Sequence, residues 1–151
     1  MKGRGGGCVR KVRLHLGAHR TATTALQATL QNNAELLADH GIGVLTRWRA
    51  GERGEQGMRR VTQRLAQATR HKGPVSWLKR AKAKRELTAL LGQCAQPVLL
   101  VSDENLLGHT FAYDGDVALY PQSDRRLALL ARTLGAPPER VHVTIRDYAS
   151  F

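Results

Sequence analysis

Apolar and polar side chains alternate over residues 12–16 (VRLHL), which is the period of a β-strand. A turn at 17–22 follows, and beyond it leucines recur on one face of a predicted helix, at Leu26, Leu30 and Leu37. The pattern predicts one helix over about 24–40, with Gly41 as the residue that ends it. The chain is therefore expected to begin its fold with a strand, a turn and a helix.

The middle of the chain predicts a short strand, a loop and two helices. The strand is expected at 42–45 and the loop at 47–56, where Gly and charged residues show no period. A helix is expected at 57–70, because apolar residues recur at Met58, Val61, Leu65 and Ala68. A second helix is expected from Ser76 to about Gln93, after a break at Gly73 and Pro74.

The last third predicts two strands around one helix. Residues 97–102 (PVLLVS) form a continuous apolar run, as in a strand buried on both faces of a parallel sheet. A helix capped by Ser123 or Asp124 is expected to end at Gly135, and alternation over 141–145 predicts the last strand. Helices between strands indicate an α/β fold, a three-layer α/β/α domain with a parallel sheet. This domain is expected over 11–151, after a disordered Gly-rich basic tail at 1–10.

Charge is the most unusual feature of the composition. The 151 residues include 24 Lys and Arg against 12 Asp and Glu, which gives a formal net charge of +12. Such a chain attracts polyanions of many kinds. Residues 79–85 include five of the Lys and Arg residues. This run is either a solvated face of the predicted helix or a docking site for an anionic acceptor or nucleic acid. No apolar run predicts a membrane span or a secretory signal, so a cytoplasmic protein is expected.

The turn at 17–22 is the first candidate for chemistry. Backbone N–H groups at a helix start lack partners within the helix and bind phosphate or sulfate readily. Aligned with the Walker A pattern G-x-x-x-x-G-K-[ST], Gly17 takes the first position and Thr24 the last. Ala22 stands at the position of the second Gly and Thr23 at the position of the Lys. The Lys that contacts the outer phosphates of a nucleoside triphosphate is therefore absent from this position.

The stretch from Gly17 to Gln27 (GAHRTATTALQ) resembles the phosphosulfate-binding loop of sulfotransferases, commonly written G-x-x-K-[ST]-G-T-T-x-[LW]. Arg20 stands at the Lys of that motif and Ala22 at its second Gly. The resemblance implies a P-loop-like domain whose donor is 3′-phosphoadenosine 5′-phosphosulfate, with no metal. It also implies a catalytic role for Arg20 and donor-binding roles for Gly17, Arg20, Thr21, Ala22, Thr23 and Thr24.

Two further positions follow from the same resemblance. The stretch 143–147 (VTIRD) is similar to the start of the family's second motif, whose Arg grips the 3′-phosphate, and this Arg is Arg146. The family places a His or Glu base near the end of the intervening strand. Glu104 is the expected base, with Asp103 and His109 as alternatives. A plain capping role for residues 102–105 is an equally open interpretation.

The expected reaction is transfer of a sulfuryl group to a hydroxyl or amine on a small molecule, a glycan or a lipid. The later motifs of the family do not follow Phe151, so a domain truncated at its C-terminus is expected, with an exposed sheet edge and marginal stability. One alternative is a P-loop kinase-like phosphoryl-transfer enzyme. Another is a basic nucleic-acid-binding module, which the scarcity of aromatic residues, 5% of the chain, disfavours.

Overall fold

The secondary structure follows a regular βα order. The computed structural model describes residues 11–17, 23–47, 57–108, 120, 122–135 and 137–145. In chain order the elements are β1 (Lys11–Gly17), α1 (Thr23–Asn32), α2 (Ala34–Asp39), β2 (Ile42–Thr46), α3 (Met58–Arg70), α4 (Gly73–Gly92), β3 (Val98–Ser102), the 3₁₀ turn η1 (Glu104–Leu106), α5 (Ser123–Leu134) and β4 (Arg140–Thr144).

The four strands form one parallel sheet in the order β2-β3-β1-β4. Strand β3 therefore lies between β2 and β1, although each of its residues is 87 positions away in sequence from its partner on β1, as in Lys11 with Val98. Among the described strands, β2 and β4 are the edge strands, because each pairs with one neighbour only. The expected α/β fold with a parallel sheet is confirmed.

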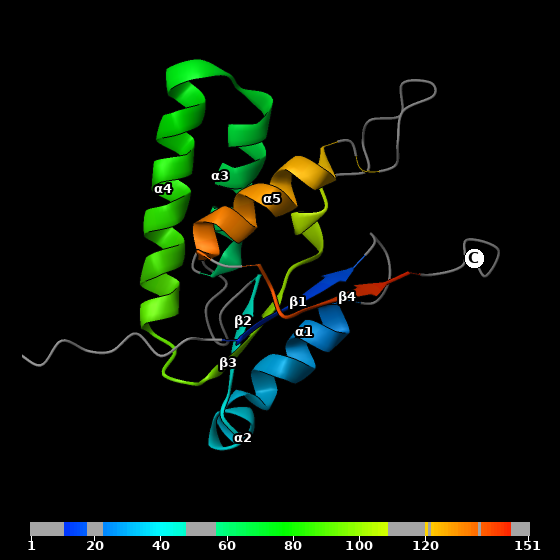
Figure 1. Ribbon diagram of the computed structural model, residues 1–151. Coiled ribbons are helices and arrows are strands. Elements are labelled where there is room, and N and C mark those ends of the chain that lie inside the picture. Colours follow the sequence, from blue (N-terminus) through cyan, green and yellow to red (C-terminus); the bar gives the residue numbers. More distant parts are fainter. Residues whose placement is uncertain are drawn as a thin grey trace, which may run out of the picture.

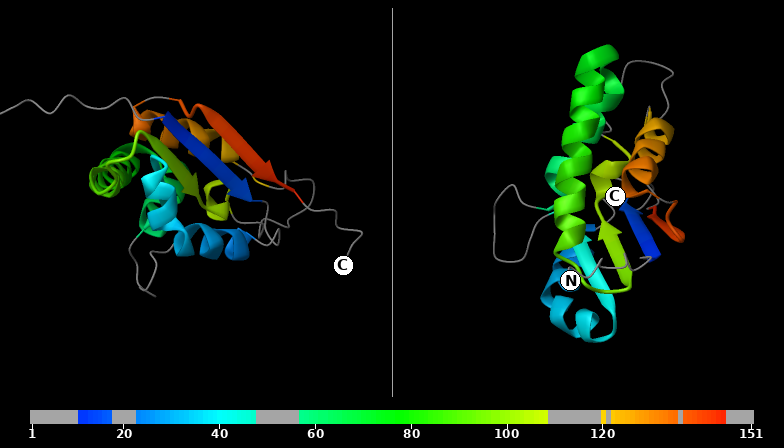
Figure 2. Two further views of the ribbon diagram at one scale, coloured as in Figure 1. Left: turned by 90° about the horizontal axis from the view of Figure 1, so that it is seen from below. Right: turned by 60° about the vertical axis from the view of Figure 1, so that its left-hand side comes forward.

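Helices cover both faces of the sheet, which makes three layers. Figure 1 shows α1 and α2 on one side of the strands and α3, α4 and α5 on the other, and Figure 2 shows the same separation from below. Helices α3 and α4 form an antiparallel hairpin that extends away from the sheet, and α5 contacts both of them.

The apolar core lies on the α3–α5 side of the sheet. Alternate residues of the central strands point there, and they are Leu14, Leu16, Leu99 and Val101. They pack against the apolar positions of α3, Met58, Val61, Leu65 and Ala68, and against Ala83, Leu87, Leu129 and Leu130 of the other two helices. The helical period predicted for 57–70 is thus confirmed, because its four apolar positions are all buried.

The helix expected over 24–40 is two helices, so this prediction is wrong. The break lies at Asn33, whose backbone leaves the helical region with φ −108° and ψ 16°. Its side-chain amide donates to the Thr29 carbonyl over 2.8 Å, which offers the backbone an alternative to the helical ladder. The buried residues of α1 are Thr23 and Gln27, whereas Leu26 of the leucine stripe is 41% exposed.

Two other element boundaries differ from the prediction. Helix α4 begins at Gly73, three residues before Ser76, because Pro74 lies in its first turn, where its missing N–H costs nothing. Gln122, with a left-handed φ of 69°, precedes α5 in place of a cap by Ser123 or Asp124. Gly41 and Gly135 do end their helices with positive φ, as predicted.

Candidate functional site

The candidate site begins where β1 ends and α1 starts. Gly17 is the last residue of β1, and Thr23 is the first residue of α1 and is 2% exposed. Thr24, the next residue, is exposed. Because the first amides of a helix lack intrahelical partners, this junction has donors for an anion. The loop residues Arg20, Thr21 and Ala22 lie outside the described residues.

The end of β3 lies beside this junction. Ser102 closes the strand, and Asp103 and Glu104 lead into η1. The hydroxyl of Thr23 donates a hydrogen bond to the Glu104 carboxylate, across 81 residues of sequence. The fold therefore brings together two of the residues that sequence reasoning singled out, one from the loop–helix junction and one from the strand end.

Asp103 is held by the fold on all sides. It is fully buried and accepts hydrogen bonds from the Thr62 hydroxyl at 2.7 Å and from the Asn105 amide N–H at 2.9 Å. Arg47 Nη1 lies 4.0 Å from Asp103 Oδ1, the oxygen that also accepts from Asn105. Burial raises the pKa of Asp103, and the two hydrogen bonds and the Arg47 charge counteract part of that rise. Asp103 thus fastens the end of β3 to α3.

His15 forms a second polar connection, within the sheet. Its Nδ1 lies 2.9 Å from Ser102 Oγ on β3, and its Nε2 lies 2.8 Å from Thr144 Oγ1 on β4. The ring is 7% exposed. Burial lowers the pKa of His15, and the nearby His142 lowers it further. His15 is therefore a residue of the sheet face, and its two hydrogen bonds connect β1 with β3 and β4.

Arg126 lies on α5, on the side of the sheet opposite α1, and its side chain reaches the segment that follows β3 and η1. It is 6% exposed, and its Nε and Nη1 have no hydrogen-bond partner among the described residues. Gly108 has a φ of +128°, and a side chain there would meet Arg126 Nη1. Burial and then the charge of Arg70 lower the pKa of this guanidinium. The positive φ, which residues with a Cβ rarely adopt, favours Gly at 108.

Sequence reasoning found part of this arrangement. Thr23 and Glu104 are joined, and Gly17 lies at the strand end as expected, whereas Arg146 and the alternative base His109 fall outside the described residues. The capping interpretation of residues 102–105 is confirmed for Asp103, which precedes η1 and accepts from the Asn105 N–H. Thr62 and Arg126 were missed. Thr62 and Arg126 lie within helical patterns that their apolar neighbours define, and no local signal distinguishes them from solvated positions.

Metal ligands and membrane spans were searched in the described parts of the chain. There, no group of three or more His, Cys, Asp or Glu side chains is placed to hold a metal ion. The helices in these same ranges are all too short or too polar to cross a bilayer. Comparison of the chain with protein-family models, with curated proteins and with solved structures finds no match.

Proposed function

We propose that this chain is a sulfotransferase that moves a sulfuryl group from 3′-phosphoadenosine 5′-phosphosulfate to a hydroxyl or an amine. The observation that carries the proposal is the hydrogen bond between Thr23, at the start of α1, and Glu104, just beyond β3. It brings a candidate base to the helix start that follows the anion-binding motif. Ligands of open α/β sheets bind beyond the carboxyl ends of the strands, which is where both residues lie.

The donor half of the proposed site rests on helix α1 and on the motif before it. The first amides of α1 supply partial positive charge for the phosphosulfate, and Arg20 would add a full charge. The roles of Arg20, Thr21, Ala22 and Arg146 come from the sequence motifs alone, because these residues lie outside the described ranges. Gly17, Thr23 and Thr24 flank the loop within the described part.

The proposed reaction is a direct displacement at sulfur. The acceptor oxygen or nitrogen forms a bond to sulfur while the bond from sulfur to the bridging phosphate oxygen breaks. The acceptor proton passes to the Glu104 carboxylate, and adenosine 3′,5′-bisphosphate leaves with its new negative charge held by the loop cation and amides. No redox partner is needed, since the sulfur keeps its oxidation state throughout.

The geometry supports Glu104 over Asp103 as the base. A base must reach the acceptor proton, and Asp103 is fully buried with Thr62 and Asn105 bound to its oxygens. Glu104 is only half-buried and has contact with the loop–helix junction through Thr23. Asp103 is accordingly assigned to holding the strand end in place, and Glu104 to proton transfer.

A phosphoryl-transfer enzyme is the second candidate, and the same pair of residues favours it. A hydroxyl and a carboxylate side by side are ligands that Mg²⁺ accepts in nucleotide sites. Thr23, however, stands at the position of the Lys that phosphoryl transfer uses on the outer phosphates. The two candidates therefore differ in their need for Mg²⁺ and in the nucleotide they select.

Calorimetric titration distinguishes these candidates. Adenosine 3′,5′-bisphosphate is titrated into the folded chain without Mg²⁺, with 5′-AMP as a control and with ATP in the presence and absence of Mg²⁺. We expect binding that is selective for the bisphosphate and independent of Mg²⁺. Binding of ATP alone, and only with Mg²⁺, would favour the kinase, while equal affinity for every nucleotide would contradict both.

Variants assign the roles. Arg20→Ala is expected to weaken bisphosphate binding about tenfold or more, since hydrogen bonds to charged groups are strong. Arg85→Ala, an exposed position on α4, is the control of equal charge. Glu104→Gln should leave bisphosphate binding within about twofold but reduce sulfate transfer at least a hundredfold, as for loss of a general base. Unchanged transfer in Glu104→Gln would remove Glu104 from the mechanism.

A further inference from the structure

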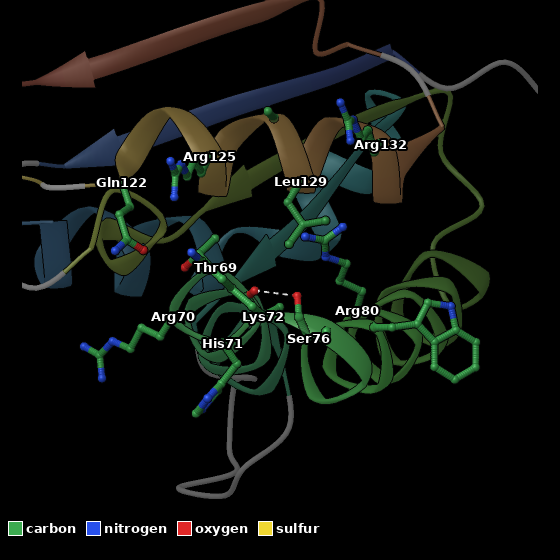
Figure 3. A pocket seen from close by; sticks show the side chains of 14 residues that line it. Thr69, Arg70, His71, Lys72, Ser76, Arg80, Gln122, Arg125, Leu129 and Arg132 are labelled. Carbon is green, nitrogen blue, oxygen red and sulfur yellow. Dashed lines mark hydrogen bonds between the residues drawn. The ribbon is translucent and has the colours of Figure 1, made fainter.

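A concave site lies on the helical side of the molecule, between α3, α4 and α5. A cavity of about 650 Å³ opens between α5 and the tip of the α3–α4 hairpin. Figure 3 shows residues from all three helices around it. Its size falls within the range of small-ligand sites.

The lining of this cavity is strongly and uniformly basic. Among the described residues that line it, five of 14 are Lys or Arg and none is Asp or Glu. The cations come from three helices and from the turn of the hairpin, and they are Arg70, Lys72, Arg80, Arg125 and Arg132. Like charges gathered in one concavity without acidic partners raise the local positive potential, because field lines concentrate in a cleft with low-dielectric walls.

The directions of the arginines favour a ligand between the helices. In Figure 3, Arg80 reaches from α4 toward α5 below Leu129, and Arg125 lies beside the first turn of α5. Arg70 and His71 point outward at the rim. The buried Arg126, with Nε and Nη1 unpartnered among the described residues, interacts electrostatically with Arg70 of the cavity lining. Guanidinium forks from two helices can thus face one bound anion.

A flat apolar surface accompanies the cations. Trp77 lines the cavity and is 70% exposed, which is unusual for an indole. An exposed indole beside arginines suits a ligand that combines a ring with charged groups. The hydroxyl of Ser76, which also lines the site, is already bonded to the Ala68 carbonyl and fixes the two helices against each other.

We propose that this cavity, the hairpin pocket, binds a sugar ring or short oligosaccharide that carries several sulfate or phosphate groups. Arginine matches the planar pairs of oxygens on these groups, and four of the five cations are arginine. A single-stranded nucleic acid fits less well, because it requires successive aromatic platforms along a groove and Trp77 is the one aromatic lining residue. The proposal does not depend on the transfer reaction.

Indole fluorescence tests the hairpin pocket directly. A Trp48→Phe background leaves Trp77 as the one reporter, since the chain has two Trp residues. The probes are a heparin-derived tetrasaccharide, inositol hexakisphosphate, an unsulfated tetrasaccharide of the same backbone and an eight-nucleotide oligothymidylate. We expect saturable binding at one site per chain for the sulfated or the phosphorylated ring, and the tighter of the two identifies the anion. The unsulfated sugar should not bind.

Matched variants separate a pocket from general charge attraction. Arg80→Ala and Arg132→Ala should each raise the dissociation constant about tenfold, and Arg85→Ala, on the same helix as Arg80 but outside the cavity, less than about threefold. An equal effect of Arg85→Ala, tighter binding of the oligothymidylate, or no saturable binding by the folded chain would each overturn the proposal. Calorimetry on the chain with both Trp residues repeats the series without the background substitution.

Discussion

The two faces of the sheet are built from different chemistry, although every strand contributes to both. The face toward α3, α4 and α5 is apolar and closed, with Leu99 and Val101 of β3 almost fully buried. The face toward α1 and α2 has half-buried apolar residues and, near the strand ends, a polar row. That row crosses all four strands and consists of Thr46, Ser102, His15 and Thr144.

The difference teaches which face stabilises the fold and which face can hold a site. Burial of apolar area supplies most of the free energy of folding, so the α3–α5 face is expected to dominate stability. The polar row instead gives directed hydrogen bonds, and it lies next to the Thr23–Glu104 pair. A reaction needs groups of fixed direction and partial exposure, which the closed apolar face cannot offer.

The largest effect is expected from neighbouring leucines that point to opposite faces. Leu99→Ala should lower the free energy of unfolding by about 3 kcal/mol, because Leu99 is fully buried and leaves a cavity. Leu100→Ala, on the half-buried α1–α2 face, should cost about 1 kcal/mol. Urea denaturation measures both. Equal losses would mean that the two faces contribute alike and would remove the contrast.

Asp103 should have the next largest effect, since it fastens the polar strand end to the apolar layer. Asp103→Ala leaves the Thr62 hydroxyl and the Asn105 amide without their acceptor and should cost about 2–3 kcal/mol. Asp103→Asn keeps an acceptor oxygen without a buried charge and should cost less. A thermal melt compares the two variants, and an Asn variant as unstable as the Ala variant would refute the assigned role.

Local sequence patterns predicted the elements well because burial dictates their period. The strand ends and the helix at 58–70 follow from apolar repeats, and Gly41 and Gly135 follow from their backbone freedom. The break at Asn33 was missed, since the leucine spacing continues through it while the side-chain bond to Thr29 competes with the helix. The apolar period of a helix therefore predicts its buried face more accurately than it predicts the residue at which the helix ends.

The candidate site was predicted in part, for a reason that concerns strand order. Placing Thr23 and Glu104 together needed only the rule that parallel strands end at one edge. The polar row needed the register between strands, because His15 and Ser102 are 87 residues apart and become partners only when β3 inserts beside β1. Nothing local in the sequence encodes that neighbour, so the row and the role of Thr62 became visible only in the fold.

The polar row should also make stability depend on pH. The pKa of His15 is lower in the folded chain than in the unfolded chain. At a pH near and below the ordinary pKa of His, the unfolded chain therefore binds the proton more readily. The free energy of unfolding should therefore fall as pH decreases from about 7 to 5, the window below an unperturbed His. His15→Gln should reduce this slope. Parallel slopes for the chain and its His15→Gln variant would exclude His15.

The smallest effects are expected on the edge strand β4, where the same two faces can be compared at adjacent positions. Thr144→Val removes the partner of His15 Nε2 without changing side-chain shape and should cost about 1 kcal/mol. Val143→Thr makes the reverse change on the apolar side, where the residue is 54% exposed, and should stay within about 0.5 kcal/mol. Urea denaturation at pH 7.5, where His15 is neutral in both states, isolates the hydrogen bond. A greater loss of unfolding free energy from Val143→Thr than from Thr144→Val would contradict this comparison. It would mean that the apolar face stabilises β4 more than the hydrogen bond between Thr144 and His15 does.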